Sequence, residues 1–245
     1  MKTLDKIFSF IVPGSIPVNN PTKEALAFYR QFFKDGDLVF DIGANIGDRT
    51  EIYKELGARV IAIEPQIECV KQLKRRYKND SNVIIVNKAV DVSGGTRTIN
   101  ICSTEPKIST MSEEWKSNSR FSNNYKWDKT QIVETVSFDN LIEEYGMPAF
   151  VKIDVEGYEL NVIKGLTKPV QAMSLEFTQE KFNNTVECIE LMSKISTYKF
   201  NVSLGESMLL ENNVWLTKDE FYDYMKNLFS GGTLLWGDIY LTLVV

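Results

Sequence analysis

The residues best suited to chemistry gather in two short segments, each at the end of an apolar run. In the first segment Asp41 is followed by glycines at positions 43 and 47, and in the second Asp154 is followed by Glu156. Glycine lets the backbone turn tightly and approach a ligand closely, and a helix that starts there offers free N–H groups. Because the carboxyl ends of parallel strands meet at one edge of a sheet, we expect both segments to line the same site.

The glycine segment favours a cationic ligand over a dinucleotide. Asn45 and Asp48 stand where the fingerprint G-x-G-x-x-G needs its second and third glycines. The carboxylate of Asp41 also opposes a pyrophosphate and attracts a positive charge. S-Adenosylmethionine carries a sulfonium and an ammonium group, so it fits this segment better than a nicotinamide dinucleotide does. A nicotinamide-dependent oxidoreductase stays open as the alternative enzyme, and a tight turn without function as the structural alternative.

Glu64 and the absence of histidine further limit the ligands that the site can bind and the residues that can act as a general base. Glu64 directly follows a second apolar run, where a carboxylate can accept hydrogen bonds from both hydroxyls of a ribose. The sequence contains no histidine, which excludes Ser-His-Asp and Cys-His arrangements and most zinc sites. A general base must therefore be a carboxylate, a lysine, a tyrosine or water.

Asp154 and Glu156 are the leading candidates for a base that takes a proton from an acceptor hydroxyl. Burial and neighbouring carboxylates can raise the pKa of such a group toward neutral pH. In the alternative reading, Asp154 orients a cofactor ammonium, while Glu156 caps the following helix or pairs with Lys152. Together with Glu176, Asp154 and Glu156 also form a set of oxygen ligands suited to a divalent metal. Whether the protein needs such a metal stays open.

The elements that must position these residues alternate short apolar runs with amphipathic stretches. That alternation is typical of a parallel sheet with crossover helices. A hairpin turn followed by an alternating strand is expected over 91–101. The expected strands are 38–42, 59–63, 83–86, 131–136, 150–154, 172–177, 200–204, 207–210 and 238–245. The expected helices are 48–56, 65–77, 137–146, 159–165, 184–195 and 218–228.

Residues 103–129 are polar but carry several aromatic side chains. Linkers rarely carry so many rings, so we expect a long loop lying over a pocket, and long loops in compact domains are often functional. Trp115, Tyr125 and Trp127 would either stack on an acceptor such as a sugar ring or pack beneath the loop. Packing is the favoured interpretation.

Length and composition allow one α/β domain with decorations in these 245 residues. The formal net charge of −5 argues against a nucleic-acid-binding surface. The basic stretch 71–78 has apolar residues at helical spacing, which indicates the solvated face of a helix. Cys69, Cys102 and Cys188 are far apart and form no CxxC pair, so we interpret them as buried thiols in a reducing compartment.

Residues 1–13 are basic and then apolar. The apolar run is too short to span a membrane, and Asp5 and Pro13 make it a poor signal peptide. No other stretch of the sequence approaches the length of a membrane helix. We therefore expect a cytoplasmic protein without a membrane span.

Three segments carry a family resemblance. Residues 39–47, V-F-D-I-G-A-N-I-G, resemble motif I of the class I methyltransferases. Residues 152–159, K-I-D-V-E-G-Y-E, resemble the hallmark of the FkbM family within them, and residues 237–240 resemble that family's closing strand. The similarity spans 35–245, so we expect a methyltransferase domain there and a helical or irregular extension over residues 1–34.

The resemblance implies a Rossmann-like class I methyltransferase fold, an α/β structure with helices on both faces. Its sheet would have seven strands, mostly parallel with one antiparallel. The implied activity is S-adenosylmethionine-dependent methyl transfer to a hydroxyl on a sugar, a glycan or a secondary metabolite. A non-catalytic S-adenosylmethionine-binding domain stays open, and the sequence does not fix the oligomeric state. The implied cofactor contacts are Asp41, Gly43, Asn45 and Gly47 around the methionine part, Glu64 at the ribose, Asn87 near the adenine, Ser109, Thr110 and Met111 along the pocket, and Asp154.

Overall fold

A computed structural model of the chain describes residues 21–231 and 234–244. The strands of its main sheet are β1 (Leu38–Ile42), β2 (Arg59–Ile63), β3 (Val83–Val86), β7 (Phe150–Ile153), β8 (Ala172–Thr178), β9 (Tyr198–Leu204) and β10 (Trp236–Leu243). They lie in the order β3-β2-β1-β7-β8-β10-β9, and only β10 runs antiparallel to its neighbours. The expected seven-stranded, mostly parallel sheet is confirmed.

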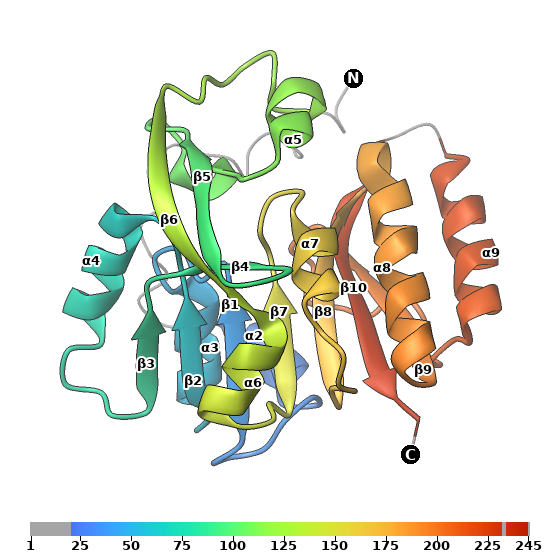
Figure 1. Ribbon diagram of the computed structural model, residues 1–245. Coiled ribbons are helices and arrows are strands. Elements are labelled where there is room, and N and C mark those ends of the chain that lie inside the picture. The colour runs from blue at the N-terminus through green and yellow to red at the C-terminus, as the bar shows by residue number, and fades with distance from the viewer. Residues whose placement is uncertain (1–20, 232–233, 245) are drawn as a thin grey trace.

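Helices cover both faces of this sheet (Figure 1). One face is covered by α2 (Lys23–Tyr29), α3 (Asp48–Glu55) and α4 (Ile67–Arg76). The other is covered by α6 (Phe138–Tyr145), α7 (Glu159–Lys164), α8 (Phe182–Ile195) and α9 (Lys218–Phe229). Each strand sends alternate side chains to the two faces, so Phe150 joins the core under α2 and α3 while Val151 joins the core under α6 and α7. The sheet is thus buried on both sides, as its continuous apolar runs predict.

The described part of the N-terminal segment packs on the sheet. The Tyr29 side chain of α2 is fully buried. Its ring centroid lies 5.0 Å from that of Tyr53 in α3 and 6.0 Å from that of Phe150 in β7. The expectation for residues 1–20, which include the basic and apolar opening, lies outside the described residues. The division of the chain at residue 35 stays a prediction.

A small second sheet is inserted between β3 and β7. Its strands are β4 (Ala89–Asp91), β5 (Gly95–Ile101) and β6 (Lys129–Ser137), in the order β4-β6-β5. The chain does turn after β4, but the hairpin expected over 91–101 is wrong because β5 pairs with β6. In register, Thr135 of β6 lies between Ala89 and Gly95, and so β6 occupies the place that a hairpin would give to β4.

Between β5 and β6 the chain forms a short 3-10 helix, η1 (Pro106–Ile108), and the helix α5 (Glu113–Asn118). Figure 1 shows this segment above the edge of the main sheet at which the parallel strands end. Trp115 of α5 is only 2% exposed. The segment expected as a long loop is therefore a folded piece of structure with a buried aromatic anchor.

Residues 207–210 do not form the expected strand. Met208 has a φ of 52°, which lies in the left-handed region and interrupts an extended backbone. Met208 and Leu210 pack partly against the core, whereas Leu209 is 67% exposed. The apolar run 208–210 is therefore part of a loop that packs partly against the core.

The expectation of buried thiols is met. The thiols of Cys69, Cys102 and Cys188 are buried and unpaired. Across the residues that the structure describes, we find no helix whose length and apolar character would allow it to cross a bilayer. The cellular compartment stays a prediction.

Candidate active site

The glycine turn after β1 lies directly against the end of β7. Gly43 has a φ of +88°, and a Cβ at this position would lie 1.9 Å from the carbonyl oxygen of Asp154. The Gly43 N–H donates to the carbonyl of Ile63 at 2.9 Å, which ties the turn to the end of β2 as well. Only glycine fits both the dihedral angle and the close approach. The two segments singled out by chemistry are thus in contact, as expected.

Asp41 is a buried acid of the site and is 2% exposed. The Thr50 hydroxyl of α3 donates to its Oδ2 at 2.5 Å. Burial raises the pKa of Asp41 to about 6, although the hydrogen bond from Thr50 and the nearby ammonium of Lys152 act in the opposite direction. Because a buried carboxylate is stabilised by a nearby positive charge, this position suits a cationic ligand.

Glu64 connects the glycine turn to β2. One carboxylate oxygen accepts from the Asn45 N–H and the other from the Gln66 N–H, both at 2.8 Å. Asn45 has a φ of 49°, so the turn presents its N–H groups from a left-handed conformation. Burial raises the pKa of Glu64 to about 7 against the effect of these two backbone hydrogen bonds. Glu64 therefore ties the glycine turn to the end of β2, and the ribose contact expected of it stays a prediction.

Asn87 directly follows β3, and Gly47 directly precedes α3, at the same edge of the sheet. The Asn87 amide is exposed and donates to the carbonyls of Glu64 and Pro65 at 3.0 and 3.1 Å. Gly47 has a φ of +92° and precedes α3, and a Cβ there would lie 2.9 Å from the Tyr77 hydroxyl oxygen. The expected positions therefore form a continuous rim along β1, β2 and β3.

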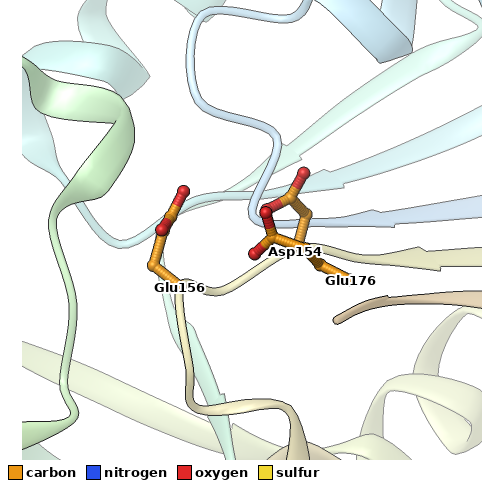
Figure 2. A group of neighbouring side chains, drawn as sticks. All are labelled: Asp154, Glu156 and Glu176. Atoms are coloured by element: carbon orange, nitrogen blue, oxygen red, sulfur yellow. The ribbon is translucent and has the colours of Figure 1, made fainter. Parts of the chain in front are cut away.

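Three carboxylates converge at the ends of β7 and β8. Figure 2 shows Asp154 just after β7, Glu156 in the following loop and Glu176 in β8. One oxygen from each lies within 4.8 Å of one from each of the others. The loop is shaped by Glu159, whose Oε1 accepts from the N–H groups of Val155 and Gly157 at 3.1 and 3.2 Å. This places Glu156, at a φ of 55°, facing the other two acids.

The environment of Glu156 and Glu176 favours the protonated forms of these two side chains. Burial, followed by the charge of Asp154, raises the pKa of both Glu156 and Glu176 well above the ordinary range. Burial also raises the pKa of Glu159 to about 7. The Trp115 indole Nε1–H donates to Glu156 Oε2 at 3.1 Å and acts in the opposite direction on that pKa. The cluster can accept and hold a proton, and three carboxylates are also the ligand type that Mg²⁺ or Ca²⁺ prefers.

Lys152 supplies positive charge beneath the cluster. It is 1% exposed, and its Nζ lies 3.2 Å from Asp154 Oδ2 and 2.6 Å from Asp238 Oδ1. Burial alone would lower the pKa of Lys152, but the two carboxylates raise it well above the ordinary value. Sequence reasoning missed the pair formed by Lys152 and Asp238. The available signal was a charged residue inside each of two apolar strands.

The segment between β5 and β6, residues 102–128, is called the inserted segment. It crosses the three carboxylates and forms ion pairs on their far side. The Thr110 hydroxyl donates to the Glu156 carbonyl oxygen at 2.7 Å, which ties the segment to the loop after β7. Two Arg120 nitrogens donate to the two carboxylate oxygens of Glu180 at 2.8 and 2.6 Å. Lys181 pairs with Glu114 of α5. The segment therefore spans the cluster from the β5 side to the end of β8.

The aromatic residues of the segment serve mainly as packing. Trp115 lies against Gly157, where a Cβ would come within 3.0 Å of the indole, and its ring centroid lies 5.9 Å from that of Phe121. Trp127 is half-buried, and its Nε1–H donates to the Ile108 carbonyl at 2.9 Å. The favoured interpretation of Trp115 agrees with its burial, and its hydrogen bond to Glu156 is a contact that the sequence did not suggest.

Comparison with known proteins assigns the chain to a family. The family model described as the methyltransferase FkbM domain matches residues 41–202, which hold the glycine turn, Glu64 and the three carboxylates. The chain belongs to the FkbM methyltransferase family. Among curated proteins, the hexuronic acid methyltransferase AglP of Haloferax volcanii is similar to this chain, with 29% identity over 144 residues. That match covers 58% of this chain and 54% of AglP, so it spans about half the length of the relative.

Solved structures give more distant similarities over most of the chain. A precorrin-6y C5,15-methyltransferase from Geobacter metallireducens is 12% identical with a TM-score of 0.48, over 95% of this chain and 94% of that one. An rRNA methylase from Streptococcus thermophilus is 10% identical with a TM-score of 0.45, over 94% of this chain and 98% of that one. The strand order and the single antiparallel strand of this FkbM protein are those of the class I methyltransferase fold.

Proposed function

We propose that this protein transfers a methyl group from S-adenosylmethionine to a hydroxyl of a sugar or glycan. The observation that carries the proposal is the contact of the Gly43 turn with Asp154, which brings Asp41 and the three carboxylates to one edge of the sheet. In open α/β sheets, ligands bind outside the carboxyl ends of the strands. Membership of the FkbM methyltransferase family supports methyl transfer as the reaction.

The residues at this edge fit S-adenosylmethionine. Gly43 and Gly47 hold the turn in left-handed conformations and close against Asp154 and Tyr77, with no room for a Cβ, and the proposed donor contact is made by the backbone of this turn. Asp41 and Asp154 supply negative charge for a cationic donor. Glu64 and Asn87 lie next along the rim, at the positions proposed for ribose and adenine, and Asn45 and Thr110 complete the proposed contacts.

The same residues can carry the chemistry. When bound, S-adenosylmethionine supplies an electrophilic methyl group, so the protein must position an acceptor oxygen and remove its proton. We assign the proton acceptor to Glu156 rather than Asp154, because Lys152 Nζ already pairs with Asp154 Oδ2 at 3.2 Å. Glu156 must be ionised to act as the base, a form that the hydrogen bond from Trp115 favours, and its raised pKa then gives the carboxylate a high affinity for the acceptor's proton.

The acceptor class rests on the relative that the chain resembles. AglP is named for methylation of a hexuronic acid, and the match covers about half of its length. A sugar ring with several hydroxyls also suits a site lined by carboxylates, which accept hydrogen bonds strongly. A secondary metabolite with a free hydroxyl is the other acceptor class to be tried.

Donor binding is tested by calorimetric titration of S-adenosylmethionine into the wild-type protein and into Asp41→Ala. We expect saturable binding to the wild type and at least a tenfold weaker affinity in the variant. Titration of NAD⁺ under the same conditions should give no binding. Unchanged affinity in Asp41→Ala, or tighter binding of NAD⁺, would overturn the donor assignment.

Turnover is tested with isotopically labelled donor and a panel of neutral sugars, hexuronic acids and secondary metabolites, with mass analysis for a single added methyl. We expect Glu156→Gln to lose most of the turnover while keeping donor affinity. Parallel reactions with EDTA and with added Mg²⁺ decide whether the three carboxylates act through a metal. Tight donor binding with no product on any acceptor would favour a non-catalytic binding domain.

A further inference from the structure

A buried ammonium beneath a cation-binding site needs an explanation. Lys152 is 1% exposed, and it would repel a positively charged donor placed against Asp41 and Asp154. An isolated buried charge is costly, and an ion pair offsets that cost only with good geometry. Here the ammonium is shared between Asp238 Oδ1 at 2.6 Å and Asp154 Oδ2 at 3.2 Å.

We propose that Lys152, anchored by Asp238, is a positioning residue that fixes the Asp154 carboxylate for the donor. This inference rests on the proposed function, and it assigns a role to two residues outside the proposed set of cofactor contacts. Lys152 would not touch the donor's reacting atoms. It would act through Asp154, whose side chain is 37% exposed and has Lys152 as its ion-pair partner.

The sheet register supports this arrangement. Lys152 of β7 lies opposite Asp41 of β1, and Asp238 of β10 lies opposite Glu176 of β8. Side chains two residues apart on a strand share a face, so Lys152 points to the same side as Asp154. The ammonium therefore lies on the same face of the sheet as both proposed donor acids.

The charge balance supports it as well. One ammonium between two ionised carboxylates carries a net charge of −1. The Arg49 guanidinium also acts on Asp238 and Lys152, but it is paired with Glu206, so the group still attracts a cation after both basic residues are counted. Without Asp238 the pair of Lys152 and Asp154 would be neutral, and the attraction would be lost. The length of the contact to Asp238, 0.6 Å shorter than that to Asp154 (3.2 minus 2.6 Å), is consistent with Asp238 as the anchor.

A purely structural role would have a different signature. If the group only holds the sheet together, its removal should change the free energy of unfolding but not the donor site of molecules that remain folded. Replacing both members of a buried ion pair by apolar residues often restores stability, whereas removing one leaves an uncompensated charge. Stability and donor affinity can therefore be separated.

The experiment compares Lys152→Met, Asp238→Leu and the double variant, with thermal unfolding and calorimetric titration of S-adenosylmethionine as readouts. We expect the double variant to be more stable than either single variant and to bind the donor at least tenfold more weakly than the wild type. Recovery of wild-type donor affinity in the stable double variant would overturn the proposal. Failure of the wild type itself to bind S-adenosylmethionine would instead contradict the proposed function.

If Lys152→Met, Asp238→Leu or the double variant does not fold, Asp238→Asn is compared with the wild type instead. The amide keeps the size of the side chain and removes its charge, so we expect donor affinity to fall three- to tenfold and KM for the acceptor to stay constant. Unchanged donor affinity in Asp238→Asn would count against the proposal. Lys218→Met is the matched control, because Lys218 forms an exposed pair with Glu190 at 2.9 Å, and it should bind the donor as the wild type does.

Discussion

A Cβ placed on Gly43 would lie 1.9 Å from the main-chain carbonyl oxygen of Asp154. This contact joins the turn after β1 to the loop after β7, and both loops carry an acid proposed to face the donor. The obstacle is backbone, which cannot rotate away as the end of a flexible side chain can. The geometry of the site therefore requires glycine at position 43, because every other residue would place a Cβ atom there.

Gly43→Ala should destabilise the protein by about 2 to 4 kcal/mol, because the strain of a left-handed alanine adds to the cost of the clash. Donor affinity should fall at least tenfold in the molecules that stay folded. The control is Gly36→Ala, since Gly36 has a φ of +83° and open space around a Cβ. Chemical denaturation of the two variants separates strain from clash, and equal losses would show that the contact with Asp154 does not matter.

Glu64→Gln should change how stability depends on pH. Burial raises the pKa of Glu64 from 4.5 to about 7 in the folded protein. The folded state then binds this proton more tightly than the unfolded state, so the stability linked to Glu64 is present below pH 4.5 and is lost as the pH rises to about 7. The variant lacks this loss. Between pH 5 and pH 8, it should gain about 2 kcal/mol relative to the wild type.

The measurement is the free energy of unfolding of the donor-free protein at several pH values. Only the difference between variant and wild type matters, since other titrating groups contribute equally to both. A difference that stays constant from pH 5 to pH 8 would mean that the Glu64 carboxyl is not perturbed by its burial.

Trp115→Phe should impair turnover more than donor binding. The substitution keeps an aromatic ring but removes the Nε1–H that donates to Glu156 at 3.1 Å. A hydrogen bond to a charged group contributes about 1.5 to 3 kcal/mol, so kcat should fall about tenfold and the pKa seen in the pH–rate profile should rise. Trp127→Phe is the control, because its indole donates to the Ile108 carbonyl instead. Equal effects of both substitutions would indicate a general loosening of the segment.

Arg120→Gln should loosen the inserted segment on the far side of the cluster. Arg120 makes a two-point contact with Glu180 and a third hydrogen bond to the Leu235 carbonyl at 3.0 Å. We expect faster hydrogen exchange in α5 and a several-fold higher KM for the acceptor, with donor affinity unchanged. Lys116→Gln, which removes a more exposed pair with Glu113, should leave both values near those of the wild type. Unchanged exchange in α5 would show that Arg120 does not hold the segment.

The sequence predicts the main sheet because the strands are continuous apolar runs buried on both faces. β1, β2 and β3 have the predicted bounds. The acids at this edge of the sheet were also predictable, since each lies near the end of such a run: Asp41 inside β1, Glu64 directly after β2 and Glu176 inside β8. Pairing between distant segments was not: β5 could have returned to β4, and only the placement of β6 between them excludes the expected hairpin.

The ion pair of Lys152 with Asp238 shows the same limit within the site. The two residues are 86 positions apart, and neither strand reveals which partner will lie beside it. The buried position of Trp115 against Gly157 likewise depends on where α5 folds over the sheet. Local pattern identifies which residues can do chemistry, and the topology decides which of them meet.

β10 occupies an interior place in the sheet although the ribosome makes it after every other strand described here. β9 cannot join the sheet until β10 has entered between it and β8, so a growing chain holds one edge of the sheet unpaired. During that interval Lys152 lacks Asp238, and pairing across such a long stretch of chain is slow. Competence to bind the donor should therefore arise in a single late step, and chaperone demand should be greatest just before it.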